Sequence, residues 1–197
     1  MHKIQIRNIV REIVSNTVDN ILKENHGEKI ICYHRSNELE HMIKGNFNLE
    51  LSDDVALFGN AIYFSESPNI AQQFGKYICK FEITLDKPVL DLNAIVDGKM
   101  QQKIVDKFNS LSNNNFETDI DDKLYPNVQF GDVLMEISDE YDWDFNKYYK
   151  QLIQSFGYNS FKYFCNYHTD FINERGDYGL CYGLYNSKNI KYIDGPF

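Results

Sequence analysis

The stretch that most constrains the fold is a short apolar run followed by a proline turn and a second apolar run. Residues 59–65 read Gly-Asn-Ala-Ile-Tyr-Phe-Ser, and the β-branched and aromatic side chains at their centre favour a strand. Ser67-Pro68 then places an N-cap residue before a proline at the first helical position, and Gly75 stands where that helix would end. Residues 77–85 alternate between faces, as a half-buried strand does. The sequence therefore predicts a strand, a helix and a strand in close succession.

A further strand is predicted upstream, over residues 29–36, where an apolar run leads into the polar segment His-Arg-Ser. A helix is expected directly after this segment, because two glutamates would occupy its first turn, where carboxylates are stabilising. The strand of residues 29–36 carries His34 near its end, and the strand of residues 59–65 carries Tyr63. We expect these two side chains to face one cleft.

Composition excludes some classes of protein. The chain has 197 residues, which is enough for one domain with a sizeable core, and its fourteen Tyr and fourteen Phe residues argue against disorder. The net charge of −9 makes a broad phosphate-binding face unexpected, although a local basic site remains possible.

The cysteines and the apolar runs indicate whether the chain binds zinc and in which cellular compartment it is expected. Four cysteines occur and none forms a C-x-x-C pair, so no zinc site is expected. Cys32 and Cys79 lie in apolar strands, where buried free thiols are common, and a reducing compartment fits. No run is long enough to span a membrane and no signal peptide is recognised. We therefore expect a cytoplasmic protein, with export by a non-classical route left open.

The remaining segments surround the strands. Residues 3–24 have apolar side chains at helical spacing, which predicts an amphipathic helix packed on the domain, with a partner-binding helix as the alternative. Residues 97–112 and 129–154 are predicted to be helical, and residues 113–127 to form a loop. Residues 117–144 contain ten acidic residues and one lysine. We interpret them as a solvated acidic surface, or alternatively as a patch that selects a basic partner.

Two more strands are predicted, over residues 158–165 and 179–186. The expected domain organisation is an N-terminal helix within residues 1–28 and one domain over residues 29–197. The acidic helical segment, about residues 97–154, would be an insertion into that domain.

Several segments, in their order along the chain, resemble the ADP-ribosyltransferase superfamily. The closest branch is the one that contains diphtheria toxin and the poly(ADP-ribose) polymerases, whose signature is His, Tyr and usually Glu on three strands. The segments are Tyr-His-Arg-Ser at 33–36, Gly-Asn-Ala-Ile-Tyr-Phe at 59–64, 71–75, Val-Leu-Asp-Leu at 89–92, Gly-Tyr-Asn-Ser-Phe at 157–161 and the closing segment 182–191.

This resemblance implies an α+β fold with two small, mostly antiparallel sheets packed face to face as a split barrel, with helices outside. It implies transfer of ADP-ribose from the oxidised nicotinamide dinucleotide (NAD) to a macromolecule, with a single unit added to a protein as the favoured outcome. NAD is then a co-substrate and no metal is implied. A free-standing domain of this kind is typical of a bacterial or phage effector or toxin, which is an analogy.

The resemblance also implies roles for individual residues. His34 would bind the adenosine ribose, and the backbone of Arg35 would hold the nicotinamide amide. The ring of Tyr63 would stack on nicotinamide and position the scissile bond. Tyr77 is a candidate second aromatic wall. The remaining residues expected to line the dinucleotide site are Ser36, Gly59, Ser65 and Cys181.

The match breaks at the third signature position, where the family's Glu falls on Cys181. A neutral cysteine does not offset developing positive charge as a carboxylate does. Three interpretations stay open. The acid comes from the adjacent loop, with Asp177 preferred and Glu174 the other candidate; or the enzyme works without this residue; or the fold binds a dinucleotide or a partner protein without turnover.

Two other branches of the superfamily are alternatives. One uses Arg, then Ser-Thr-Ser, then Glu-x-Glu. Arg35 and the segment Ser65-Glu66-Ser67 are similar to its first two parts, but no Glu-x-Glu occurs near residues 172–182, which ranks it lower. The other, the RNA 2′-phosphotransferases, shares the scaffold with His and basic residues. The net charge of −9 counts against nucleic acid as the substrate.

Overall fold

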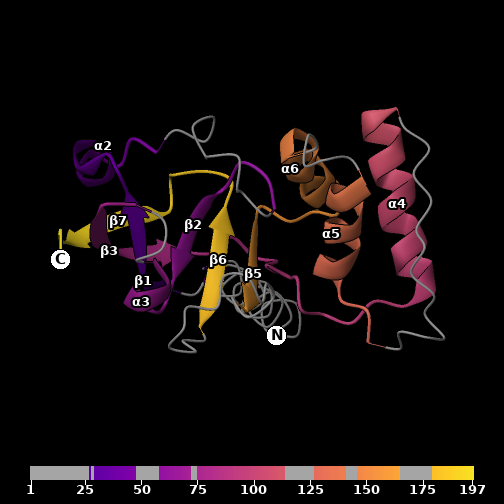
Figure 1. Ribbon diagram of the computed structural model, residues 1–197, viewed down its shortest axis with the longest axis horizontal. Coiled ribbons are helices and arrows are strands. Elements are labelled where there is room, and N and C mark those ends of the chain that lie inside the picture. The colour runs from indigo at the N-terminus through magenta and orange to yellow at the C-terminus, as the bar shows by residue number, and fades with distance from the viewer. Residues whose placement is uncertain are drawn as a thin grey trace, which may run out of the picture.

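The computed structural model describes residues 27, 29–47, 58–71, 75–113, 127–140, 146–164 and 179–197. Within these residues the chain is an α+β protein, with the strands on one side and the helices α4, α5 and α6 grouped on the other (Figure 1). The strands are β1 (Lys29–Ser36), β2 (Ile62–Ser65), β3 (Tyr77–Thr84), β4 (Leu90–Asp91), β5 (Ser160–Phe164), β6 (Leu180–Leu184) and β7 (Ile190–Asp194). The helices are α2 (Leu39–Lys44), α3 (Pro68–Ala71), α4 (Gly98–Ser112), α5 (Phe130–Glu140) and α6 (Asn146–Ser155).

The described strands form one seven-stranded sheet in the order β4-β5-β6-β2-β1-β3-β7. All neighbours are antiparallel except β4 and β5. Strands β1 and β3 pair over their whole length, from Lys29 opposite Thr84 to Ser36 opposite Tyr77. Strands β1 and β2, by contrast, pair at one described position, where Tyr33 lies opposite Ser65. The sheet is therefore narrowest at the β1–β2 junction, with four strands on one side of it and three on the other.

This topology confirms the predicted α+β class and corrects the sheet arrangement. In the described residues there is one sheet rather than two separate sheets packed face to face. The reason is that the short strand β2 pairs with β6 through one edge and with β1 through the other, so it joins the two groups of strands.

Two hydrophobic clusters occupy different parts of this sheet. The first lies between the helices and strands β4, β5, β6 and β2, and it includes Phe161, Tyr163 and Cys181. The second lies around strands β1, β3, β2 and β6 under α2, and it includes Cys32, Phe64 and Phe81. Because side chains alternate along a strand, β2 and β6 contribute to both clusters.

Local signals account for most element boundaries. Helix α3 begins at Pro68, and the N–H of Ala71 donates to the carbonyl of Ser67 over 3.2 Å. Helix α4 begins after Asp97, whose carboxylate accepts the Met100 N–H at 2.8 Å, as an N-cap does. The chain leaves α2 at Gly45 with φ of 69°, a conformation that favours glycine.

The helical predictions hold in part where the chain is described. Helix α4 matches the prediction over residues 97–112, with Ile104, Val105 and Phe108 buried. The single helical stretch expected over residues 129–154 consists of two helices, α5 and α6. The predicted helix over residues 3–24 and loop over residues 113–127 lie outside the described residues or almost entirely so.

Candidate functional site

The register across β6, β2 and β1 decides which candidate side chains share a face of the sheet. Tyr33 is opposite Ser65, and Ser65 is opposite Cys181. Directly opposite residues of antiparallel strands point to the same face, and so do residues two apart. Tyr33, Arg35, Tyr63, Ser65 and Cys181 therefore point to one face, which we call the pocket face. The other face of β1, which carries Cys32 and His34, is the closed face.

On the closed face, His34 lies among aromatic rings. Its ring centroid is 5.4 Å from those of Phe47 and Phe64 and 6.3 Å from that of Phe81. Its Nδ1–H donates to the carbonyl of Tyr63 over 2.7 Å, which joins β1 to β2 where the backbone pairing is short. Burial lowers the pKa of His34, so the neutral ring is favoured. His34 is thus held as a structural side chain.

Tyr63 packs into the other hydrophobic cluster. Its ring centroid is 5.9 Å from that of Phe161, and its hydroxyl donates to Gly59 O over 2.8 Å and accepts the Phe58 N–H at 3.0 Å. Burial raises the pKa of the Tyr63 hydroxyl well above its ordinary value. Gly183, opposite Tyr63, makes room for Phe161, because a Cβ there would lie 2.0 Å from the Phe161 ring.

The expectation that His34 and Tyr63 face one cleft is therefore wrong. The two rings lie on opposite faces of the sheet, because the pairing of Tyr33 with Ser65 puts Phe64, not Tyr63, on the face of His34. A shift of the register by one residue would have brought the two side chains together. The residue next to His34, Arg35, is the one that shares a face with Tyr63.

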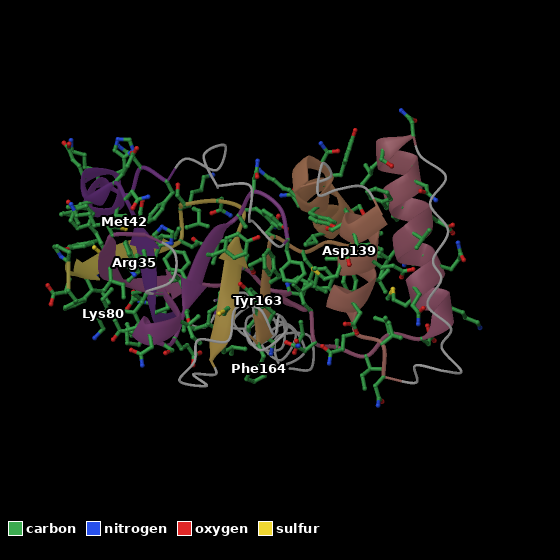
Figure 2. The ribbon with its side chains drawn as sticks, in the orientation of Figure 1. Arg35, Met42, Lys80, Asp139, Tyr163 and Phe164 are labelled. Carbon is green, nitrogen blue, oxygen red and sulfur yellow. The ribbon has the colours of Figure 1, made fainter. Side chains whose placement is uncertain are left out.

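The pocket face carries a cavity of about 390 Å³ at the end of β1 (Figure 2 labels Arg35). It lies between β1 and β3, next to the start of α3 and beside Phe197. Among the described side chains around it, two are cationic, two are aromatic and none is acidic. The lining residues are Tyr33, Arg35, Pro68, Lys76, Ile78 and Phe197.

Arg35 is the best-placed binding group in this pocket. Its Nε is buried, and no hydrogen-bond partner for it occurs among the described residues. A buried donor of this kind costs free energy until it is paired, so a ligand that accepts its hydrogen bond gains affinity. Lys76 is exposed at the rim, with its Nζ 5.1 Å from the centroid of the Tyr77 ring.

The aromatic side chains of the pocket come from segments that are far apart in the sequence, β1 and the residues after β7. The rings of Tyr33 and Phe197 are 6.5 Å apart and meet edge to face, at 67°. The N–H of Phe197 donates to the carbonyl of Ile78 over 3.0 Å, which ties the backbone of Phe197 to β3. The side chain of Phe197 is nevertheless 68% exposed. Its ring is therefore largely open to solvent beside the pocket.

Other predicted site residues have local structural roles. The Ser65 hydroxyl is buried and accepts the Ser67 N–H at 3.1 Å. The Ser36 hydroxyl accepts the Glu38 N–H at 3.1 Å, ahead of α2, and Ser36 pairs with Tyr77 in the sheet. Gly59 contributes its carbonyl to Tyr63. Of the predicted binding residues, Arg35 lines the pocket.

The third signature position is occupied by a buried cysteine. Cys181 is 3% exposed, stands opposite Ser65 and is disulfide-bonded, so it offers no thiolate. Asp177 and Glu174, the candidate replacement acids, lie outside the described residues. Cys32 and Cys79 are buried and free, as the strand pattern predicts.

The sequence interpretation missed Tyr33, Lys76 and Phe197 as pocket residues. Tyr33 and Lys76 could have been found, because alternation puts Tyr33 on the face of Arg35, and Lys76 directly precedes β3. No pattern in the neighbouring sequence marks Phe197 as a pocket residue. It reaches the pocket because β7 pairs with β3 and the chain then passes Ile78.

Comparisons with known proteins leave the family open. No family model matches the chain, and no curated protein matches it. A solved structure of an anti-CRISPR protein aligns with a TM-score of 0.38 and 14% sequence identity, covering 85% of this chain and 98% of that one. A TM-score this low does not establish a common fold.

The described residues also exclude two features. None of their helices is long and apolar enough to cross a membrane. No group of three or more His, Cys, Asp or Glu side chains in the described ranges is arranged to hold a metal ion.

Proposed function

We propose that this chain is an NAD-dependent ADP-ribosyltransferase that adds a single ADP-ribose unit to a macromolecule, with a protein as the favoured acceptor. The observation that carries the proposal is the strand order β6-β2-β1, which brings together three segments of the resemblance that are far apart in the sequence. Ser65 stands between Tyr33 and Cys181 in register. The family places its three signature residues on three strands, and here the corresponding strands are neighbours.

The geometry favours Arg35 over His34 as the residue that anchors the dinucleotide. Arg35 shares the pocket face with Ser65 and Cys181, whereas His34 is on the closed face and hydrogen-bonded to Tyr63. This arrangement is closer to the Arg and Ser branch of the superfamily than to the His and Tyr branch. A guanidinium can bind a phosphate through two parallel hydrogen bonds, so Arg35 would hold the diphosphate of NAD.

Catalysis would then depend on positioning and charge. When the bond between nicotinamide and ribose breaks, positive charge develops on the ribose, and a nearby carboxylate stabilises it only in the transition state. Asp177 is the candidate for this carboxylate, with Glu174 as the alternative. Tyr63 would act indirectly, because its hydroxyl ties the segment at Phe58 and Gly59 to β2.

The test is release of nicotinamide from NAD, measured together with transfer of labelled ADP-ribose to proteins of a cell lysate. We expect the wild type to show both. Arg35→Gln should lower turnover by roughly 10²-fold through misplaced substrate, and Asp177→Asn should lower it through lost charge stabilisation. Lys80→Gln is the matched control, because Lys80 lies on the face of Ile78 but does not line the pocket.

Two outcomes would overturn parts of this proposal. If Asp177→Asn keeps full activity, Asp177 is not the acid, and Glu174→Gln becomes the next variant. If the wild type releases no nicotinamide with any lysate, the chain is not a transferase.

A second candidate is binding of the dinucleotide without turnover. It is favoured by the buried, disulfide-bonded cysteine at the position of the family's Glu and by the lack of an acidic side chain among the pocket's described lining residues. Calorimetry with NAD separates the two functions. Binding with no nicotinamide release supports the binding module, and binding followed by release supports the enzyme.

A further inference from the structure

The charge of the pocket is opposite to that of the protein. The chain as a whole has a net charge of −9, yet the described residues that line the pocket include Arg35 and Lys76 and no acidic residue. A concave site with charges of one sign concentrates ligands of the other sign, and its low-dielectric walls strengthen the effect. The buried Arg35 Nε adds a donor that lacks a partner among the described residues. These features indicate a ligand with at least one phosphate-like anionic group.

The walls of the pocket indicate what is attached to that anion. Tyr33 and Phe197 offer aromatic surfaces, and Pro68 and Ile78 are apolar. A flat base can contact such walls by stacking on the aromatic rings. The volume of about 390 Å³ is near the lower end of the range for ligand pockets, roughly 300–1,000 Å³. The space therefore suits one nucleotide better than a whole dinucleotide.

We infer that this pocket binds the adenosine diphosphate half of the dinucleotide, with the base against Tyr33 and Phe197 and the phosphates against Arg35 and Lys76. The identity of the nucleotide rests on the proposed function, whereas the recognition of a base and a phosphate rests on the pocket. The nicotinamide half then extends from the pocket along the face that carries Ser65. Phe197, tied by its backbone to β3 and exposed at its ring, would pack against the bound base from the solvent side.

The experiment is calorimetric titration of the full chain with ADP, AMP, adenosine, inorganic phosphate and nicotinamide. We expect ADP to bind more tightly than AMP, and adenosine, phosphate and nicotinamide to bind at least tenfold more weakly than ADP, since each lacks one part of the recognition. Arg35→Gln, Lys76→Gln and Phe197→Ala should each weaken ADP binding, Arg35→Gln by about tenfold. Raised salt should weaken ADP binding further.

Matched controls are available on the same protein. Lys80→Gln removes a lysine on β3 that does not line the pocket, and Phe164→Ala removes an aromatic ring that is 50% exposed on β5 (Figure 2). Both should leave ADP affinity unchanged. Lys76 and Phe197 are exposed, so their variants should stay folded even if Arg35→Gln does not.

The outcomes separate this inference from the proposed function. If ADP does not bind, or binds equally well to Lys76→Gln and Phe197→Ala, the inference is overturned, even when NAD is still hydrolysed. If ADP binds through these residues and no nicotinamide is released from NAD, the pocket stands and the transferase proposal fails. Equal affinity for adenosine and ADP would also overturn the inference, because the cations would then play no part.

Discussion

The two faces of β1 have opposite characters, although the residues that form them alternate along one strand. On the closed face, His34 lies against three aromatic rings and donates a hydrogen bond to the neighbouring strand. On the pocket face, Arg35 lines a cavity and has a buried Nε with no partner in the described part of the chain. A paired polar group stabilises the fold, whereas an unpaired one is available to a ligand. The comparison indicates a structural role for His34 and supports the proposed binding role of Arg35.

The largest expected effect is a loss of stability when the central aromatic ring of the closed face is removed. Phe81 is fully buried and contacts the rings of His34, Phe47, Phe64 and Tyr192. Phe81→Ala should lower the free energy of unfolding by about 3–5 kcal/mol, the usual cost of removing a buried phenyl ring. Denaturant titration measures this change. A loss below about 1 kcal/mol would contradict the assignment of this face as a rigid core.

The next largest effect is a loss of stability at His34, which distinguishes this residue from its neighbour Arg35. His34→Ala should cost about 1–3 kcal/mol of stability, because the Tyr63 carbonyl loses its donor and the aromatic rings lose a contact. Its affinity for NAD, measured by calorimetry on the folded variant, should equal that of the wild type. Weakened NAD binding at unchanged stability would return His34 to the dinucleotide site and remove the distinction between the two faces.

A pH dependence follows from the same side chain. Burial lowers the pKa of His34 in the folded state below its ordinary value of 6.5. The unfolded chain therefore binds the proton first, and stability falls as the pH drops through 6.5 toward the lower folded-state pKa. The slope for one proton is at most about 1.4 kcal/mol per pH unit. The difference between wild type and His34→Gln, from unfolding curves at pH 5 to 8, should show this slope; an identical pH profile would refute it.

The smallest effect on stability belongs to the pocket face. Phe197→Ala should change the free energy of unfolding by less than about 0.5 kcal/mol, because its ring is largely exposed. The same variant should lose ADP affinity. The small change in stability, in contrast to the large loss expected for Phe81→Ala, would complete the comparison of the two faces. A large loss of stability with unchanged ADP binding would make Phe197 a packing residue.

Much of the secondary structure could be predicted from the sequence. The boundaries of β1 and the start of α3 follow from local alternation and from Ser67-Pro68. The buried face of α4 follows from helical spacing. Cys32 and Cys79 were correctly predicted as buried thiols. Such features depend on side chains within a few residues of one another, so the sequence contains the information needed to predict them.

The site was predicted only in part. The resemblance singled out the Tyr-His-Arg-Ser segment at 33–36, and one of its binding candidates, Arg35, lines the pocket. Which of His34 and Arg35 faces Tyr63 depends on a register between strands β1 and β2, set by a single described pair. A shift by one residue reverses the faces, and nothing local in either strand specifies it.

The sequence by itself determined most of the elements, the α+β class and the segments that resemble a transferase, because periodicity, caps and turns act over short distances. The tertiary structure alone decided that one sheet joins the strands, that His34 and Tyr63 lie on opposite faces, and that Phe197 and Lys76 line one pocket with Arg35. Those outcomes come from pairing between strands that are distant in sequence, where hydrogen bonds and burial in the whole sheet select one register. Local sequence patterns predict which residues are candidates for a site, and pairing between distant strands decides which of those side chains face each other.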